Sequence, residues 1–529
     1  MKKILIILMT FLVIASCTKL EDLNKDTKRP TAVPGVTLFS NAQVNLAKQI
    51  ASTNVNMNVF KLWAQYWTET TYTDESNYDI VNRTIADNAF REWYRDVLMD
   101  LKDARMIIGA TTFATEAETL AAKNQLLIID IHEVFVYERL VTLFGNVPYT
   151  EALDIDNIQP KYDDAMTIYK DLLVRLDTDI AGLSTGGTES FGTADLVYGG
   201  DVSSWILFAN SLKLKMGTIL SDVDATLAAT TINSAIAGGV ISSNADNAEF
   251  YFLAATPNTN PLYVDLTLSG RQDFVGTTTM LDDVMTPYVD PRMTKYFKGL
   301  AFVYDEDDAG DPVDTNLEGE GNVVLIYRNA TDENDSLVPV ELPFMVYAAD
   351  ASNPFTYNLG GFPGRSNPYV DFSKVGDVIT TDPTFPCLLI SYSEVEFYLA
   401  EAAARADNDA GTIEHYKAGI TASFDYWSVA GADDYIASDS VTYDPAKTWE
   451  EQIGTQSWIA FYNNGYLGWT VYRRLGFPIM PVAEDATISV IPTRFTYPID
   501  EQTLNPANYA EASAAIGGDL LTTKLWFEK

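Results

Sequence analysis

Apolar residues recur at steps of three and four along several long stretches of the chain, a spacing typical of amphipathic helices. The clearest stretch runs from residue 119 to residue 144, and Gly145 and Pro148 after it are residue types that end helices. The same spacing occurs in four further stretches, at 38–63, 163–183, 202–220 and 391–405. Paired helices of this length suit helix–turn–helix stacking of the tetratricopeptide kind, although the chain has no clean repeat of fixed period.

The middle of the chain, residues 250–385, lacks this helical spacing. It is rich in Pro, Gly, Asn, Thr and Asp, with short β-branched runs such as 323–327, and it predicts long loops and a few short strands. A loop-rich stretch of this length in a helical protein is usually functional surface. We therefore expect a mainly α fold: a helical scaffold at 37–249, a loop-rich ligand-binding segment at 250–385, and further helices and loops at 386–529 in the same compact fold.

The first residues have the pattern of a secretory signal. Two lysines precede an apolar run at 4–14, which is too short to span a bilayer, and small residues then lead to Cys17. This arrangement resembles a lipobox, which implies a signal peptide at 1–16, a lipid on Cys17 and a tether over 17–36. The alternative is an ordinary signal peptide with an incidental cysteine.

No later stretch has the composition of a membrane span. The apolar stretch 128–136 contains Asp130, His132 and Glu133, and these polar groups argue against a lipid environment. We therefore expect a protein that is anchored to a membrane by lipid and does not cross it.

The charge balance of the chain is strongly acidic. The 529 residues include 73 acidic and 35 basic side chains, and the formal net charge is −38. Such a body is repelled by nucleic acid, which we exclude as a partner. The acidity serves solubility or, alternatively, attracts cations such as calcium. The acidic cluster at 305–314 has Ala309 and Asn316 where an EF-hand needs ligands, so we interpret it as a solvated loop and expect no cofactor, with a bound calcium as the alternative.

Two loops combine aromatic and planar polar side chains, the two groups that hold the apolar faces and the hydroxyls of a sugar. The first loop is 65–78, and the second is 355–369. A weaker third candidate is 271–274. The alternative for all three loops is ordinary packing against the scaffold. The candidate ligand-binding residues are Trp67, Tyr72, Asn77 and Tyr78 in the first loop, and Tyr357, Phe362, Arg365 and Tyr369 in the second.

Several segments, in order, resemble blocks of one known family, the SusD/RagB family in its SusD-like branch. They are the Gly-x-Val-Pro-Tyr turn at 145–149, a block at 205–215, Asp-Pro-Arg at 290–292, Ala-Glu-Ala at 400–402, Tyr-Arg-Arg-x-Gly-x-Pro at 472–478, and the end region 497–526. Each match alone is weak, but together with the lipobox they are specific and span nearly the whole mature chain.

The resemblance implies a scaffold of tetratricopeptide-like helix pairs with a binding face of inserted loops. It also implies a lipid-anchored protein of the outer membrane, exposed at the cell surface, that acts as a lid on a SusC-like, TonB-dependent transporter. The acidic residues Glu21 and Asp22 resemble the surface-export signal of such lipoproteins, or they belong to a plain solvated linker.

On this basis we expect a nutrient-binding lipoprotein that captures a glycan, and not an enzyme. The alternatives are peptide capture on the same architecture, an all-α glycoside hydrolase that uses two carboxylates, and a structural surface protein. No phosphate-binding loop, nucleophile elbow or zinc-binding pair occurs in the sequence, and therefore no catalytic residue is assigned.

Overall fold

The computed structural model describes residues 33–301, 325–328, 338–341 and 356–528. The signal peptide, Cys17, Glu21, Asp22 and most of the expected tether lie outside these residues, as does the acidic cluster at 305–314. The first described helix begins at Gly35, inside the last part of the stretch expected to be a tether.

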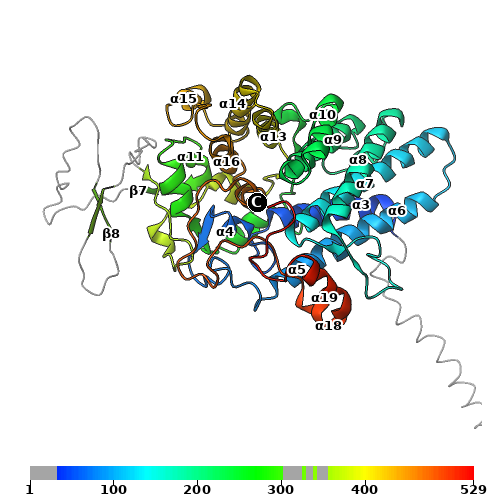
Figure 1. Cartoon of the computed structure of the whole chain (residues 1–529), viewed down its shortest axis with the longest axis horizontal. Helices are drawn as coiled ribbons and strands as arrows, with labels where there is room; N and C mark the ends of the chain where they lie inside the picture. The colour runs from blue at the N-terminus through cyan, green and yellow to red at the C-terminus, as the bar shows by residue number, and fades with distance from the viewer. Residues whose placement is uncertain (1–32, 302–324, 329–337, 342–355, 529) are drawn as a thin grey trace, which may run out of the picture.

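The N-terminal half is built from helices that pack in pairs, and these helices lie together at the right-hand end of the body in Figure 1. In each pair an apolar face of one helix covers that of its neighbour. The pairs are α3 (Gly35–Ala51) with α6 (Met99–Ala110), α7 (Glu116–Leu143) with α8 (Ala165–Thr185), and α9 (Val202–Ile219) with α10 (Ala225–Gly238); α5 (Ile85–Arg91) and a π-helical turn (Glu92–Leu98) lead into α6.

The C-terminal part continues the same architecture. Helix α13 packs against α14, and α16 packs against α17, so the expected mainly α fold with paired helices is confirmed. The bounds of these helices are α13 (Tyr392–Arg405), α14 (Asp409–Tyr426), α15 (Ala432–Ala437), α16 (Trp449–Ala460), α17 (Gly465–Leu475), α18 (Ile499–Leu504) and α19 (Pro506–Ala515).

The long helices lie where the apolar spacing predicts them, within a few residues, but the predicted helix over 38–63 is wrong in its second half. Helix α3 ends at Ala51, and only a short helix, α4 (Phe60–Trp63), follows. The side chains of Ser52 and Asn58 bond the backbone here: the Ser52 hydroxyl accepts from the amide of Asn54, and Asn58 donates to the carbonyl of Gln49, both at 2.9 Å. Such side-chain bonds compete with the helix and end it.

Helix α7 is the central helix of the scaffold, and its second half is buried on every side. Three of its carboxylates have basic partners on neighbouring helices: Arg175 donates to Asp130 at 2.9 Å and to Glu133 at 2.8 Å, and Lys215 pairs with Glu138 at 2.9 Å. Pairing offsets the cost of burying these charges. Among the described residues, no helix is both long and apolar enough to cross a membrane.

The strands are short, and most of them belong to the loop-rich middle of the chain. The largest sheet is antiparallel, with the strand order β1 (Trp67–Glu69), β5 (Phe274–Gly276), β11 (Lys374–Val375) and β6 (Phe297–Lys298). Two-stranded ladders join β2 (Val147–Pro148) with β3 (Tyr162–Asp163), β4 (Ala248–Phe250) with β12 (Cys387–Ile390), β7 (Leu300–Ala301) with β10 (Thr356–Tyr357), and β8 (Leu325–Arg328) with β9 (Val338–Glu341). Short helices α11 (Met293–Tyr296) and α12 (Asp377–Thr380) flank the large sheet.

Strand β7 and the helix α11 beside it lie at the left-hand end of the body in Figure 1, opposite the scaffold helices α3 and α6. The chain enters the body at the scaffold end, where Gly35 packs against Ile108 near the end of α6. Strand β7, a part of the loop-rich segment, thus lies at the end of the body far from the entry of the chain.

Buried arginines join segments that are distant in the sequence. Arg473 donates to the carbonyl of Thr142 at 2.8 Å and pairs with Glu528 at 3.1 Å, which fixes the C-terminal end against α7. Arg474 pairs with the buried Glu401 of α13. These arginines satisfy buried carbonyl and carboxylate groups and do not face solvent.

The Asp-Pro-Arg motif supplies a further ion pair of this kind. Asp290 and Arg292 are both completely buried, and the guanidinium Nη2 lies 2.6 Å from the carboxylate. Arg292 also donates to Ser423 at 3.0 Å and to Gln456 at 3.2 Å, and its guanidinium carbon lies 4.9 Å from the centre of the Phe424 ring. The pair therefore connects the middle segment to α14 and α16.

We expect Arg292→Ala to lower the free energy of unfolding by roughly 3–5 kcal/mol, because the substitution leaves the carboxylate of Asp290 buried without a cation. Denaturant unfolding followed by circular dichroism measures the change. The control is Lys170→Ala, which removes a half-exposed ion pair with Asp224 at 3.3 Å and should cost no more than about 1 kcal/mol. Equal losses in the two variants would contradict a stabilising role of the buried pair.

Candidate functional site

The two loops expected to bind a ligand lie against each other, although almost 300 residues separate them in the sequence. Asn77 donates to the carbonyl of Gly364 at 2.7 Å, and Asn367 donates to the carbonyl of Glu69 at 3.0 Å. The hydroxyl of Ser366 adds a bond of 2.9 Å to the first loop. The two candidate loops therefore form one surface.

A third segment, 479–487, completes this surface, although no pattern in the sequence marks it as part of a site. The amide of Thr487 donates to the carbonyl of Asn77 at 3.0 Å, and the amide of Glu484 donates to the carbonyl of Pro363 at 3.2 Å. Its exposed apolar residues, Ile479 at 73% and Val482 at 40%, are a signal that only exposure in the fold reveals. We call residues 69–79, 361–367 and 479–487 the loop junction.

Two of the predicted aromatic contacts are buried. Trp67 is 1% exposed in strand β1, where its indole donates to the hydroxyl of Tyr462 at 2.9 Å. Tyr78 is also 1% exposed, and its hydroxyl accepts from the amide of Ala483 at 3.2 Å. Neither ring has a free face, so the expectation that Trp67 and Tyr78 form a sugar platform is corrected. Both side chains support the first loop from the interior of the protein.

Asn77 likewise holds the loops together. It is 7% exposed, and its amide group donates to Gly364 and, at 3.1 Å, to the hydroxyl of Thr73. With its amide protons bonded within the protein, Asn77 positions the loop junction and has no free donor for a ligand.

Tyr72 is the aromatic residue of the first loop that faces solvent. Its side chain is 85% exposed, and its backbone has a φ of 56°, in the left-handed region that tyrosine rarely adopts. Strained backbone of this kind costs of order 1 kcal/mol and persists where the surrounding structure enforces it, often at functional positions. The loop junction thus presents one free aromatic ring.

The second loop supplies a planar polar group to the loop junction. Arg365 is exposed and pairs with the carboxylate of Glu484, and its guanidinium carbon lies 5.0 Å from the centre of the half-buried Phe362 ring. Tyr357 belongs to strand β10, which pairs with β7, and its side chain lies outside the described residues.

Tyr369 lies on a different surface, in a hollow of about 150 Å³ at the edge of the large sheet. We call this hollow the basic groove. Its polar lining includes Thr267, Arg271, Lys298, Tyr369, Lys374 and Asp377. Arg271 comes from the weaker third candidate segment, which is thereby brought beside the second loop.

The basic groove and the loop junction are connected through the backbone of residues 272 and 273. The amide of Thr70 donates to the carbonyl of Asp273 at 2.9 Å, and the Thr70 hydroxyl donates to the carbonyl of Gln272 at 2.6 Å. Because β1 and β5 are antiparallel, Tyr72 and Arg271 extend from the same end of this strand pair.

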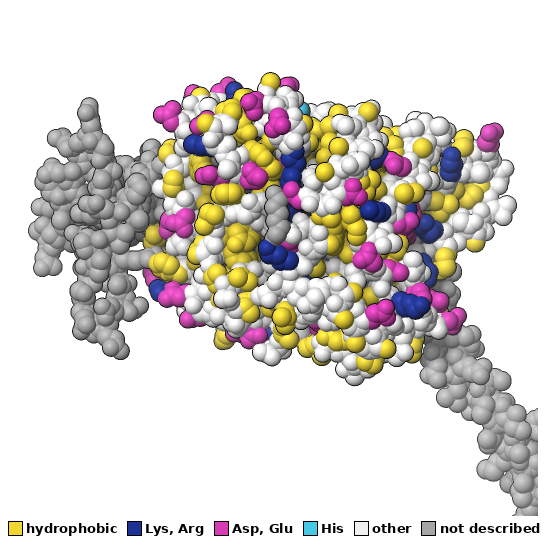
Figure 2. Space-filling view, viewed as in Figure 1, with side chains coloured by type: hydrophobic (Ala, Val, Ile, Leu, Met, Phe, Trp, Pro, Cys, Tyr) yellow, Lys and Arg dark blue, Asp and Glu magenta, His cyan; other side chains and the backbone are white. Residues whose placement is uncertain are grey.

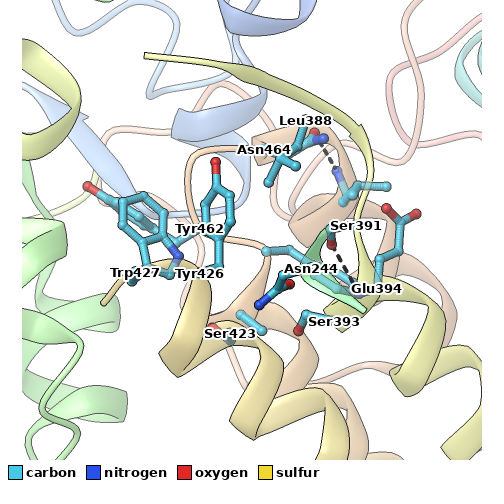
Figure 3. A pocket seen from close by; sticks show the side chains of 13 residues that line it. Asn244, Leu388, Ser391, Ser393, Glu394, Ser423, Tyr426, Trp427, Tyr462 and Asn464 are labelled. Carbon is cyan, nitrogen blue, oxygen red and sulfur yellow. Dashed lines mark hydrogen bonds between the residues drawn. The ribbon is translucent and has the colours of Figure 1, made fainter. Parts of the chain in front are cut away.

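Another hollow, shown in Figure 3, lies inside the helical body and has a volume of only about 30 Å³. Asn244, Ser393 and Asn464 are among the side chains that line it, and the side-chain nitrogen of Asn464 is buried without a hydrogen-bond partner. The space suits a single water molecule and is too small for a sugar. It is therefore not a candidate ligand site.

No group of three or more His, Cys, Asp or Glu residues in the described part of the chain could hold a metal ion. The acidic cluster at 305–314 is not included in that statement.

A buried carboxyl pair lies beneath the loop junction. Glu69 is 4% exposed; burial and the neighbouring Glu75 raise the pKa of Glu69 to about 8, although its carboxylate accepts from the amide of Ser76 at 2.9 Å. Glu75 is fully buried and pairs with Arg83 at 2.9 Å. At neutral pH, Glu69 therefore holds a proton, which lets the two carboxyl groups lie together.

The fold and the site together define a class of protein: a scaffold of paired helices that displays a surface of aromatic and polar loops suited to binding. The family model described as "Starch-binding associating with outer membrane" matches residues 27–498. The chain therefore belongs to the SusD-like family.

Solved structures of similar proteins agree with this family. A chitin-binding protein is 25% identical, with a TM-score of 0.71 over 93% of this chain and 99% of the other. A SusD homologue from Bacteroides uniformis is 22% identical, with a TM-score of 0.72 over 93% and 99%. A chitin-binding SusD homologue from Flavobacterium johnsoniae is 22% identical, with a TM-score of 0.69 over 93% and 97%. No curated protein matches the chain.

We expect Glu69→Gln to stabilise the protein at pH 8 and to have little effect near pH 4.5. The pKa of Glu69 is raised in the folded state, so above pH 4.5 the unfolded chain loses a proton that the folded chain keeps, and the free energy of unfolding falls as the pH rises toward 8. Thermal melts from pH 4.5 to pH 8 should show a gain in Tm of about 1 to 3 °C for the variant at the alkaline end.

The control for this experiment is Glu189→Gln, at an exposed position of the scaffold. It should follow the unsubstituted protein at every pH. A Glu69→Gln variant whose Tm difference does not change with pH would contradict the raised pKa.

Proposed function

We propose that this protein is a nutrient-binding lipoprotein at the cell surface that captures a glycan for import through a SusC-like, TonB-dependent transporter of the outer membrane. The observation that carries the proposal is the loop junction, where three distant segments meet and expose Tyr72, Arg365 and Glu484. Membership of a family described as starch-binding, and the likeness to two chitin-binding proteins, support a glycan as the ligand.

The chemistry of the loop junction suits a saccharide. An exposed aromatic ring offers a flat apolar face to the C–H groups of a sugar, and the guanidinium and carboxylate of Arg365 and Glu484 can bond its hydroxyls. The hydrogen bonds between the loops hold these groups in place before the ligand arrives, which reduces the entropy lost on binding.

The arrangement of the body fits a role at the membrane. The chain enters the body at the scaffold end, and strand β7 of the loop-rich segment lies at the opposite end (Figure 1). A lipid on Cys17 would therefore hold the scaffold near the membrane while the described part of the loop-rich segment extends away from the entry point.

The alternative of a glycoside hydrolase receives no support from two carboxyl pairs whose pKa values are perturbed. Burial and Asp130 raise the pKa of Asp179 to about 9, and burial and Glu75 raise that of Glu69 to about 8. In each pair the carboxyl group with the raised pKa is almost fully buried, at 3% exposure for Asp179 and 4% for Glu69. A glycosidase instead needs two carboxyl groups that can reach the scissile bond of a bound sugar.

We expect Tyr72→Ala to weaken glycan binding by roughly 1 to 2 kcal/mol, about tenfold in Kd, because an exposed aromatic anchor is lost. Affinity gel electrophoresis and calorimetry with chito-oligosaccharides and malto-oligosaccharides measure the change. The matched control is Tyr251→Ala, which removes a 60% exposed tyrosine outside the loop junction and should leave the affinity unchanged.

The same samples test the alternatives. Binding of peptides without binding of any oligosaccharide would replace the glycan by a peptide. Shortened oligosaccharides after overnight incubation would show an enzyme. Unchanged affinity of Tyr72→Ala would reject the loop junction as the site.

A further inference from the structure

The basic groove reverses the charge balance of the protein. The chain has 73 acidic and 35 basic residues, but the groove is lined by Arg271, Lys298 and Lys374 against the single acidic residue Asp377. On the face shown in Figure 2, by contrast, acidic and basic side chains are interspersed. The clustering of three basic side chains around one hollow requires a physical reason in a protein with a net charge of −38.

Internal pairing accounts for only part of this positive charge. Lys298 lies 3.0 Å from the carboxylate of Asp377, and Arg271 lies 3.5 Å from that of Asp273; all four side chains are about half exposed, so these pairs exchange readily with solvent and ligands. Such exposed pairs contribute little to the stability of the fold. Stability therefore does not explain why the cations gather here.

Lys374 is the more telling member of the group. Its ammonium nitrogen donates to the carbonyl of Val370 at 3.2 Å and lies 5.4 Å from the centre of the Tyr369 ring, and it makes no ion pair in the described part of the chain. Partial burial and the nearby Lys298 lower the pKa of Lys374, against the opposing effect of Asp371. An anion between the two lysines would remove this repulsion.

The groove also offers the other groups that a sugar needs. Tyr369 presents an aromatic ring at its wall. Thr267 and Thr381 also line the groove; their hydroxyls donate to the carbonyls of Thr380 and Asp377, both at 2.6 Å, so their oxygens can serve a sugar as acceptors. The backbone of residues 272 and 273 connects the groove to Thr70, two residues before the exposed Tyr72 of the loop junction. A chain of several sugar units could therefore contact both surfaces at once.

We propose that the basic groove binds the anionic substituent, a carboxylate or a sulfate, of an acidic saccharide whose chain also contacts the loop junction. This inference rests on the proposed glycan-binding function and specifies its substrate class. Long-range repulsion from the acidic body is screened beyond about 8 Å at physiological salt, so a local cluster of cations can still hold an anion. Because salt also screens the attraction between these cations and the anion, the preference for an acidic saccharide should weaken as salt is added.

The experiment compares acidic saccharides with neutral forms of the same chains. Calorimetry with the purified protein compares oligogalacturonate and alginate oligosaccharides with their carboxyl-reduced forms. It also compares chondroitin sulfate oligosaccharides with their desulfated forms. We expect at least one acidic chain to bind about tenfold more tightly than its neutral form. The pair in which the preference appears distinguishes carboxylate from sulfate.

The double variant Arg271→Gln/Lys298→Gln, at two positions that are each 59% exposed, should abolish that preference, so that the acidic and the neutral form bind with equal affinity. Lys374→Met should reduce the preference in the same direction. The matched control is Arg95→Gln/Lys170→Gln, which removes the same charge from exposed positions on the scaffold and should keep the preference.

Each result decides between the two proposals. Neutral glycans that bind as well as every acidic form would overturn the acidic substrate class and leave the glycan-binding function intact. An acidic preference that survives the double variant would overturn the groove as its source. Equal binding of poly-glutamate peptides would replace the saccharide by an acidic peptide. No binding of any saccharide would overturn both proposals.

Discussion

Buried basic side chains that bond to distant parts of the sequence hold this structure together. Arg473 connects α17 to the end of α7 and to the C-terminal residues, Arg474 connects α17 to α13, and Arg292 connects the middle segment to α14 and α16. Lys215 does the same between α9 and α7. Because a buried charge without its partner is costly, these segments are stable only when they are assembled together.

The loop junction depends on that assembly. Trp67 is buried because Tyr462, almost 400 residues later, accepts its indole proton, and this contact holds the start of the first loop on the body. The loop then turns through Tyr72 with a strained backbone and an exposed ring. The helical body thus holds the loop in a conformation that leaves one aromatic ring exposed.

Charge has two separate effects in this protein. The large negative charge favours solubility and repels nucleic acid. Because acidic side chains outnumber basic ones by 73 to 35, a cluster of cations at the surface is informative. The cluster around Tyr369 and Lys374 gives the basic groove a chemistry different from that of the loop junction, and we propose that the two surfaces together recognise both the ring and the charge of a sugar chain.

The sequence by itself determined the helices of the scaffold, because the apolar spacing of α7, α8, α9 and α13 is a local property that also fixes the buried face. It also singled out the two aromatic loops, since their aromatic residues do not recur at the spacing of a helix or strand that packs on the core. The sequence could not decide which aromatic ring is exposed, because Trp67, Tyr72 and Tyr78 all lie in the same polar and aromatic loop. Only the contacts of Trp67 with Tyr462 and of Tyr78 with Ala483 show which rings are buried. The third segment of the loop junction and the basic groove were likewise decided by tertiary structure, because both arise where residues about a hundred or more positions apart meet.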